Sequence, residues 1–302
     1  MPHLISIVGP TGVGKTQLSV QLAQHYQTEI LSGDSRQMYR KMDIGTAKPT
    51  IEERSGIPHH FLDTLDPDQS YSPGQFERDA SELLEQLFRT HEVAIMVGGS
   101  TLYMESFWYQ MNEMPEVPAE VREKLNQEFK ESGLGELLEE LMRVDPFTYE
   151  VVDRANPARI IRALEVYRAS GTPISTFRTG RKPKVRPYKI HKIGLTDNRD
   201  LLYNRINLRV DQMIESGLEA EVRNLWDAGY QEEDPGIKSI GYQEWYPYFR
   251  EEYDREEAIR LIKRNSRRYA KRQLTFYRRH EDIEWFQAGQ WDTVREWLSE
   301  QI

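Results

Sequence analysis

Residues 9–16 read GPTGVGKT and match the pattern G-x-x-x-x-G-K-[ST]. An apolar run at residues 4–8 precedes them and a helix-like segment at residues 17–26 follows, which is the strand, loop and helix order that this pattern requires. Backbone N–H groups of such a loop turn inward around a diphosphate, and the following helix adds its positive end. A chance glycine-rich turn is the alternative, and the loop alone does not say which diphosphate it binds. The predicted diphosphate-binding residues are Gly9, Pro10, Thr11, Gly12, Val13, Gly14, Lys15 and Thr16.

Within this loop Lys15 is expected to reach a phosphate, and the hydroxyl of Thr16 is expected to hold Mg²⁺. The chain of 302 residues is 38% hydrophobic, which is enough for one large domain or for one domain with an insertion. It has no cysteine, which excludes disulfides and thiolate metal sites and fits a reducing compartment. No apolar run approaches the length of a membrane span. We therefore expect a cytoplasmic protein without a membrane partner.

The positive charge is unevenly distributed along the chain. The net charge is −9, which by itself disfavours a nucleic-acid partner. However, residues 178–192 contain seven Lys or Arg and residues 258–280 contain nine, and neither stretch contains an acid. Two concentrated basic stretches on an otherwise acidic chain are typical of a local phosphate-binding surface.

Two further predicted strands end in polar or glycine-rich segments. Residues 28–31 lead into Ser32-Gly33-Asp34, and residues 93–97 lead into Gly98-Gly99-Ser100. In an open parallel sheet the carboxyl ends of the strands face the ligand crevice, so Asp34 and Ser100 are expected beside the diphosphate loop. Asp34 is our candidate general base, although an aspartate at this place also fits a helix cap or the shell of a metal ion.

The remaining pattern predicts an α/β fold in which helices flank a mostly parallel sheet. Residues 113–142 are predicted to form a small helical insertion with a break at Gly133 and Gly135, and residues 1–112 and 143–302 are assigned to the catalytic core. We also expect helices at 74–89, 156–169, 199–228 with a break at Gly217, and 256–279, and strands at 188–195 and 283–286.

Several ordered motifs together resemble the tRNA dimethylallyltransferases, also called IPP transferases. They are residues 9–16, Asp34-Ser35-x-Gln37-x-Tyr39, 42–49, 59–63, 98–100, 159–165 and 271–279. The resemblance covers nearly the whole chain and implies a P-loop NTPase-like core. It implies transfer of a dimethylallyl group from dimethylallyl diphosphate, with Mg²⁺, to N6 of the adenosine 3′ of the anticodon (position 37) in tRNA. The partner would be the anticodon stem-loop, and the enzyme is expected to be a monomer.

The resemblance also assigns site residues. It supports Asp34, Ser100 and Arg209 as catalytic, with Arg209 in the segment R-I-N-x-R and its neighbour Arg205 on the same helix face. For both arginines the residue spacing alone fits a solvated or salt-bridged helix face equally well. The predicted tRNA contacts are Asp34, Ser35, Arg36, Gln37, Arg122, Ala158, Arg159, Ile160, Ile161, Arg162, Lys271, Arg272, Gln273 and Arg278.

The basic helix at 256–279 interleaves charge with Tyr269, Phe276 and Tyr277, a mixture suited to RNA backbone binding and base stacking. Core aromatics on a solvated helix are the alternative. Gln37 is suited to bidentate contact with an adenine edge. A P-loop small-molecule kinase is the competing hypothesis, against which stands the Gly-Gly-Ser that ends strand 93–97, where a Walker-B-like Asp is expected. A non-catalytic RNA-binding module would leave Asp34 and Arg209 without a role.

Overall fold

The computed structural model describes residues 1–112, 114–178, 180 and 182–302. The chain forms two compact units, which we call the core unit (Met1–Trp108 and Val185–Ile302) and the helical unit (Tyr109–Lys184). The helical unit extends well beyond the insertion predicted at 113–142. Residues 143–184, which the sequence analysis assigned to the core, belong to it because Ile160 and Leu164 share one apolar cluster with Leu125 and Leu141.

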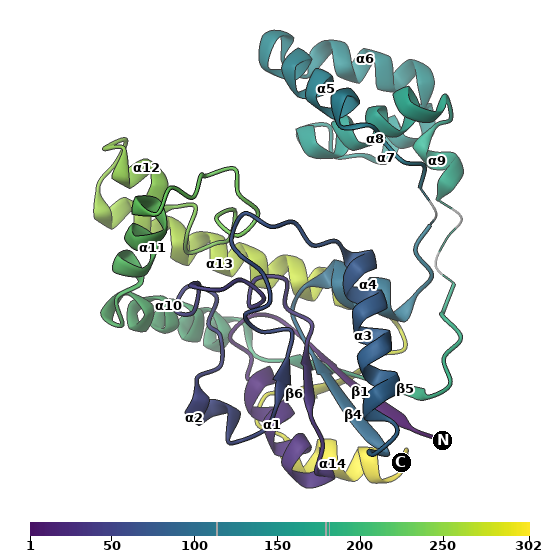
Figure 1. Cartoon of the computed structure of the whole chain (residues 1–302), viewed down its shortest axis with the longest axis vertical. Coiled ribbons are helices and arrows are strands. Elements are labelled where there is room, and N and C mark those ends of the chain that lie inside the picture. The colour runs from purple at the N-terminus through teal and green to yellow at the C-terminus, as the bar shows by residue number, and fades with distance from the viewer. Residues whose placement is uncertain (113, 179, 181) are drawn as a thin grey trace. The chain divides into compact units, whose positions relative to one another are not determined.

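A six-stranded sheet of order β3-β2-β4-β1-β5-β6 forms the centre of the core unit (Figure 1). Every neighbouring pair is parallel, and β1 lies between β4 and β5 with His3 opposite both Val93 and Lys189. This confirms the predicted α/β fold with a P-loop NTPase-like core. The strands are β1 His3–Val8, β2 Ile30–Ser32, β3 His59–His60, β4 Val93–Val97, β5 Lys189–Thr196 and β6 Glu284–Gln287.

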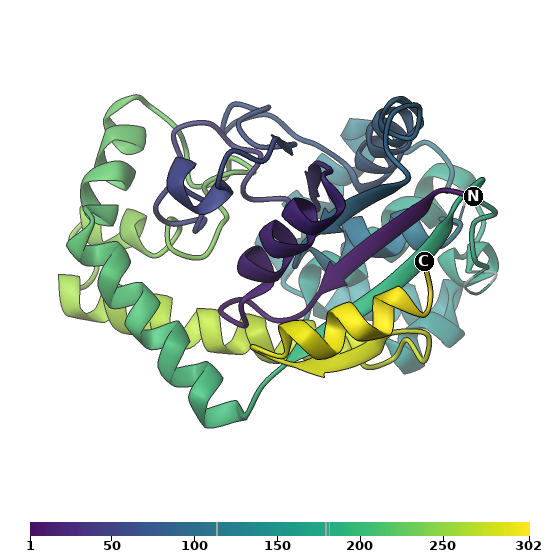
Figure 2. The same ribbon diagram turned by 90° about the horizontal axis from the view of Figure 1, so that it is seen from below.

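The two faces of β1 differ in chemistry and carry different helices. Ile5 and Ile7 share an apolar cluster with α1 (Lys15–Tyr26) and α14 (Trp291–Ser299), which both lie on the near side of the sheet in Figure 2. Ser6 lies between them in the sequence, and its Oγ accepts a 3.0 Å hydrogen bond from Nε1 of Trp108 at the end of α4 (Thr101–Trp108). The alternation of a strand therefore places α4 opposite α1 and α14.

Helix α3 (Pro73–Leu87) packs against α4, and its buried residues are Phe76, Ala80, Leu84 and Leu87. Leu83 is only partly buried. The core unit also contains the short α2 (Ile51–Arg54).

A second apolar cluster of the core unit joins α10 (Arg199–Glu215), α11 (Leu218–Asp227), α12 (Trp245–Phe249) and α13 (Arg255–Tyr277). The predicted break at Gly217 is present, because this residue has φ 95° and separates α10 from α11. Figure 1 shows α10 and α13 side by side, and residues of the two helices are in contact. The basic helix predicted at 256–279 is α13.

The helical unit consists of α5 (Ala119–Ser132), α6 (Gly135–Val144), α7 (Pro146–Val151), α8 (Pro157–Ser170) and α9 (Ile174–Phe177). Arg168 on α8 ties the unit together, because its guanidinium donates to Glu128 on α5 at 2.8 Å and to Glu140 on α6 at 2.5 Å. Among the described residues of the whole chain, no helix is both long and apolar enough to cross a bilayer.

Candidate active site

The diphosphate loop links β1 to α1 and has the backbone shape that the sequence pattern requires. Gly12 and Gly14 have φ angles of 79° and 101°, which L side chains rarely adopt. Helix α1 begins at Lys15 with no side chain capping its N-terminus, so the N–H groups of its first turn are available to an anion. The ammonium of Lys15 folds back over the loop and donates to the carbonyls of Gly9 at 3.1 Å and Pro10 at 2.9 Å.

Lys15, Asp34 and Arg209 lie in one electrostatic neighbourhood. Burial lowers the pKa of Lys15 to about 8, the negative charge of Asp34 opposes this shift, and the positive charge of Arg209 adds to it. Helix α10 lies directly against the loop, because a methyl group added at Gly12 would be 3.1 Å from the Cγ1 of Ile206. Arg209 follows Ile206 by about one helical turn. The structure therefore gathers three residues that are separated by up to 194 positions in the sequence.

The two arginines of α10 differ in their partners. Arg205 forms an ion pair with Asp197, the structural alternative considered for it from the sequence. Arg209 forms no ion pair with any described residue. Loss of hydration lowers the pKa of Arg209 and Arg205 lowers it further, whereas Glu53 opposes both. Arg209 is thus left as a charged group beside the diphosphate loop.

Asp34 follows the end of β2, in a turn that is held by hydrogen bonds of Asp34 and of Ser35. One of its carboxyl oxygens accepts the backbone N–H of Arg36 at 2.9 Å, and no described residue donates to the other. The next residue, Ser35, donates its backbone N–H to Oγ of Ser100 at 2.8 Å, and Ser100 donates to the Ser35 hydroxyl at 3.0 Å. Ser100 is buried, and its two hydrogen bonds to Ser35 connect the ends of β2 and β4. Its contact with a leaving diphosphate stays a prediction.

The side chains of Arg36 and Gln37 are committed to protein partners. The guanidinium of Arg36 donates to the carbonyl of Pro235 at 2.6 Å. The amide of Gln37 donates to the carbonyl of Ala47 at 3.0 Å and accepts from the hydroxyl of Ser32 at 3.3 Å. The predicted bidentate contact of Gln37 with a base would have to replace these bonds.

The glycine-containing segment at 42–49 is held by one carboxylate that the sequence analysis did not single out. Glu221 accepts the backbone N–H groups of Asp43 and Ile44 at 2.9 Å each and that of Gly45 at 3.1 Å. The hydroxyl of Tyr242 donates to the same carboxylate at 2.5 Å. These partners lie far apart in the sequence and follow no spacing rule, so no sequence pattern pointed to them.

The cations of the basic helix α13 differ in whether they form ion pairs. In its first half Arg260 pairs with Glu257 and Lys263 pairs with Asp211. In its second half Lys271 and Arg272 are exposed, as is Arg278 at the helix end, and none of these three forms an ion pair with a described residue. Three predicted tRNA contacts are therefore accessible and uncompensated.

Two residues of α13 that were predicted to face RNA have buried side chains. Gln273 is 1% exposed, its Oε1 accepts the backbone N–H of Thr11 at 2.9 Å, and its Nε2 donates to the carbonyl of Gly99 at 2.7 Å, so its side chain is committed to protein partners. Tyr277 is fully buried and is not available for base stacking. Tyr269 instead lies near the site, since burial and then the charge of Asp34 raise its pKa to about 12.

The basic stretch at 178–192 is divided between the two units, because the helical unit ends at Lys184 and the core unit continues at Val185. Two of its residues serve the core unit. The guanidinium of Arg186 donates to Glu77 at 2.7 Å and to the carbonyl of Phe107 at 2.9 Å. The ammonium of Lys192 donates to Asp282 at 2.5 Å. Both cations are therefore paired within the core unit.

The helical unit has its own cationic site. A cavity of about 490 Å³ is lined by the guanidinium-bearing residues Arg122, Arg159, Arg162 and Arg178, together with Ala158. Of these, only Arg178 was absent from the residues predicted to contact tRNA. The buried Glu165 partly balances the charge: Arg162 donates to one of its oxygens at 2.5 Å, and Nε of Arg122 is 3.6 Å from the other.

The neighbouring isoleucines of α8 do not belong to this cavity. Ile160 is fully buried and Ile161 is 4% exposed, and both pack in the apolar core of the helical unit. Their side chains therefore serve the core, and the contact of these two residues with tRNA stays a prediction.

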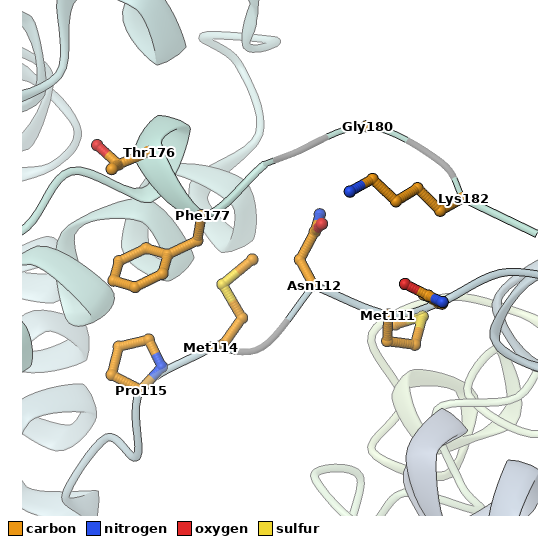
Figure 3. Close-up of a pocket in the computed structure, with 9 residues that line it drawn as sticks. Met111, Asn112, Met114, Pro115, Thr176, Phe177, Gly180 and Lys182 are labelled. Carbon is orange, nitrogen blue, oxygen red and sulfur yellow. The ribbon is translucent and has the colours of Figure 1, made fainter. Parts of the chain in front are cut away.

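A larger cavity of about 610 Å³ lies between the two connecting segments of the helical unit (Figure 3). Asn112 and Lys182 reach into it from opposite segments, and Met114, Pro115 and Phe177 form an apolar side. The two segments are joined by a 2.8 Å hydrogen bond from the backbone N–H of Gln110 to the carbonyl of Lys182. None of the predicted site residues lines this cavity.

Comparison with known proteins places these features in a family. Residues 37–280 match the family model described as IPP transferase. The chain is 45% identical to a tRNA dimethylallyltransferase of Cytophaga hutchinsonii, with 95% of this chain and 93% of that protein covered. It is 41% identical to tRNA dimethylallyltransferase 2 of Parabacteroides distasonis, with both chains fully covered.

Solved structures give the same result. A tRNA isopentenylpyrophosphate transferase of Bacillus halodurans superposes with a TM-score of 0.74 at 38% identity, with 100% of this chain and 97% of that chain covered. A eukaryotic dimethylallyltransferase acting on tRNA gives a TM-score of 0.80 at 27% identity, covering 99% of this chain and 78% of that one. The sequence matches, the shared fold and the arrangement around the diphosphate loop lead to one conclusion: this chain belongs to the IPP transferase family.

Proposed function

We propose that this protein transfers the dimethylallyl group of dimethylallyl diphosphate to N6 of the adenosine at position 37 of tRNA, next to the anticodon. The observation that carries the proposal is the grouping of Lys15, Asp34 and Arg209 around one loop. This grouping provides cations for a diphosphate and a carboxylate for a proton at the same place. The names of the relatives at 41–45% identity support the same activity.

The diphosphate of the donor is assigned to residues 9–16. The free N–H groups at the start of α1 bind its oxygens, and Lys15 turns from the carbonyls of Gly9 and Pro10 toward them. Arg209 approaches from α10 and stabilises the charge that accumulates as the diphosphate leaves. A shared diphosphate target accounts for two cations that lie close together and form no ion pair with a described residue.

The residues around the loop also fit Mg²⁺. Within the described part of the chain, no group of three His, Asp or Glu side chains is arranged to hold a metal. A single hydroxyl is a sufficient protein ligand for Mg²⁺, which commonly takes one or two protein oxygens and completes its shell with water and substrate phosphates. We assign the protein ligand to the hydroxyl of Thr16. When bound, Mg²⁺ neutralises part of the charge on the diphosphate.

The acceptor step requires a base, because the lone pair of an exocyclic adenine amine is delocalised into the ring. In the proposed reaction N6 attacks C1 of the dimethylallyl group, the bond between C1 and the diphosphate oxygen breaks, and one N6 proton passes to Asp34. Asp34 suits this role because one of its oxygens is held by the N–H of Arg36 and the other has no described donor. The products are the alkylated adenosine and diphosphate.

We assign RNA binding to two cationic surfaces, one in each unit. They are the exposed residues Lys271, Arg272 and Arg278 of the core unit, and the cavity with its four arginines in the helical unit. The target base has to leave the stack of the anticodon loop to reach the donor, and phosphate contacts to these cations would hold the RNA while it does so. All these groups come from one chain, so we propose that a monomer acts on one tRNA, and that it does so in the cytoplasm.

Incubation of the wild-type protein with bulk tRNA and either labelled dimethylallyl diphosphate or labelled ATP tests this proposal. We expect the label of the prenyl donor in RNA and none from ATP. Phosphoryl transfer from ATP would instead indicate a small-molecule kinase. Binding of RNA without turnover of either donor would indicate a non-catalytic RNA-binding module.

A further inference from the structure

One buried amide joins the RNA-binding helix to the diphosphate loop. Gln273 lies in the middle of the accessible half of α13, next to Arg272, but its side chain points inward and is 1% exposed. Its Oε1 accepts the backbone N–H of Thr11 at 2.9 Å, and its Nε2 donates to the carbonyl of Gly99 at 2.7 Å. A single side chain thus bonds both to the loop after β1 and to the segment after β4.

The fit around this amide is close. A methyl group added at Gly99 would lie 2.4 Å from Nε2 of Gln273, so only glycine leaves room for the amide at this place. The hydroxyl of Tyr269, one turn earlier on α13, is 3.5 Å from the same carbonyl of Gly99. Helix α13 therefore contacts the segment after β4 through Tyr269 and Gln273, and Gln273 also contacts the diphosphate loop.

We propose that Gln273 is a positioning residue for donor binding: its amide fixes Thr11 and Gly99 relative to each other and so holds the diphosphate loop in its binding shape. The inference rests on the proposed function only in that the loop binds a diphosphate. Thr11 lies inside this loop, so releasing its N–H lets the loop adopt other backbone shapes. The role differs from that of Lys271 and Arg272, whose side chains lie on the exposed side of the same helix.

Gln273→Met tests the proposal, because methionine fills a similar volume but can neither accept from Thr11 nor donate to Gly99. We expect inorganic diphosphate and dimethylallyl diphosphate to bind about tenfold or more weakly, and kcat/KM for the donor to fall by up to about 100-fold. The affinity for tRNA in the absence of donor should stay within about threefold. Leu274→Met, the next residue of the helix, is the matched control and should keep both affinities.

Gly99→Ala supplies a second, independent perturbation of the same amide. We expect it to weaken diphosphate binding as Gln273→Met does, and the double variant to be no weaker than the more affected single variant, because both changes break one contact. Additive losses would show that Gly99 and Gln273 affect diphosphate binding independently, which contradicts the shared contact on which the proposal depends.

Three results would overturn the proposal. They are unchanged diphosphate affinity in a folded Gln273→Met protein, a loss of tRNA affinity larger than the loss of diphosphate affinity, and additive losses in the double variant. Folding is checked by circular dichroism and thermal unfolding. Binding of inorganic diphosphate tests the role of Gln273 by itself, since a kinase would also need the same loop shape. Use of the prenyl donor tests the proposed function, because only a prenyltransferase consumes it.

Discussion

At the scale of single residues, Lys15 couples donor binding to pH. Burial lowers its pKa to about 8, so in the free protein its ammonium loses its proton at a pH where an exposed lysine stays charged. A bound diphosphate favours the charged form and raises this pKa again. The proton on Lys15 and the diphosphate therefore bind cooperatively.

We predict that the affinity for dimethylallyl diphosphate is constant just below pH 8 and falls as the pH rises above about 8, by at most about tenfold per pH unit. Titration calorimetry at several pH values measures this. Lys15→Arg keeps its charge throughout this range and should show no such decline, even if its affinity is lower. A decline of equal slope in Lys15→Arg would assign the titration to another group.

Asp34 has two roles that can be separated by substitution. It accepts the N–H of Arg36 within its turn and is proposed to accept a proton from N6. Asp34→Asn keeps an oxygen for the turn but cannot act as a base, whereas Asp34→Ala loses both functions. We predict that kcat falls by about 100-fold or more in both variants while tRNA affinity changes little. Near-normal turnover in Asp34→Asn would make Asp34 a turn-forming residue only.

At the scale of elements, Glu221 shows how a helix fixes a loop. Its carboxylate accepts three backbone N–H groups of residues 43–45 and the hydroxyl of Tyr242, and burial raises the pKa of that tyrosine well above its usual value, with Glu221 adding to the shift. The same segment supplies the carbonyl of Ala47 that holds Gln37. Glu221 on α11 thereby supports the turn that carries Asp34.

We predict that Glu221→Ala lowers the free energy of unfolding by about 3 kcal/mol, because it leaves several polar groups without their acceptor. Urea denaturation measures this value. Glu219→Ala on the same helix is the control: it removes a partly exposed ion pair with Arg255 and should cost less than about 1 kcal/mol. Equal losses in the two variants would contradict the role given to Glu221.

The exposed cations of α13 that form no ion pair with a described residue lead to a prediction about RNA affinity. Each cation that neutralises a phosphate releases counterions, so Arg272→Ala and Arg278→Ala should each weaken tRNA binding and flatten its salt dependence by slightly less than one unit in log K against log salt. Donor affinity should not change.

Arg260→Ala is the control, because Arg260 forms an ion pair with Glu257 on the same helix. This variant should leave the salt slope unchanged. Unchanged slopes in both Arg272→Ala and Arg278→Ala would move the RNA surface to the arginine-lined cavity of the helical unit.

At the scale of the whole molecule, the sequence predicts those features that depend on residues close together in the chain, such as strands, helices and the shape of the diphosphate loop. Residues 93–97 form β4 as expected, and the helices of the apolar pattern are present within a few residues. Strand β2 begins two residues later than expected, at Ile30, because the backbone N–H of Thr28 is bonded to the carbonyl of Ala23 in α1 and not to a neighbouring strand. The loop pattern around Lys15 likewise predicts a local backbone shape, and the observed φ angles agree with it.

Features that depend on distant partners could not be predicted in this way. The polar pattern of α13 does not distinguish Gln273, which turns inward, from Arg272, which is exposed. The extent of the helical unit depends on which apolar faces meet, and Ile160 and Ile161 were assigned to RNA because a motif does not reveal burial. The bonds of Gln273, and those of Glu221 to residues 43–45, span more than 170 positions and become visible only in the fold.

The most direct test of the central claim is nucleoside analysis of tRNA after reaction with dimethylallyl diphosphate. We predict that mass spectrometry finds one dimethylallyl group on N6 of adenosine 37. The modification should be absent with Lys15→Met, and a tRNA without adenosine at this position should not be modified. Modification at another atom or nucleotide, or a tRNA that stays unmodified with folded wild-type protein, would contradict the claim.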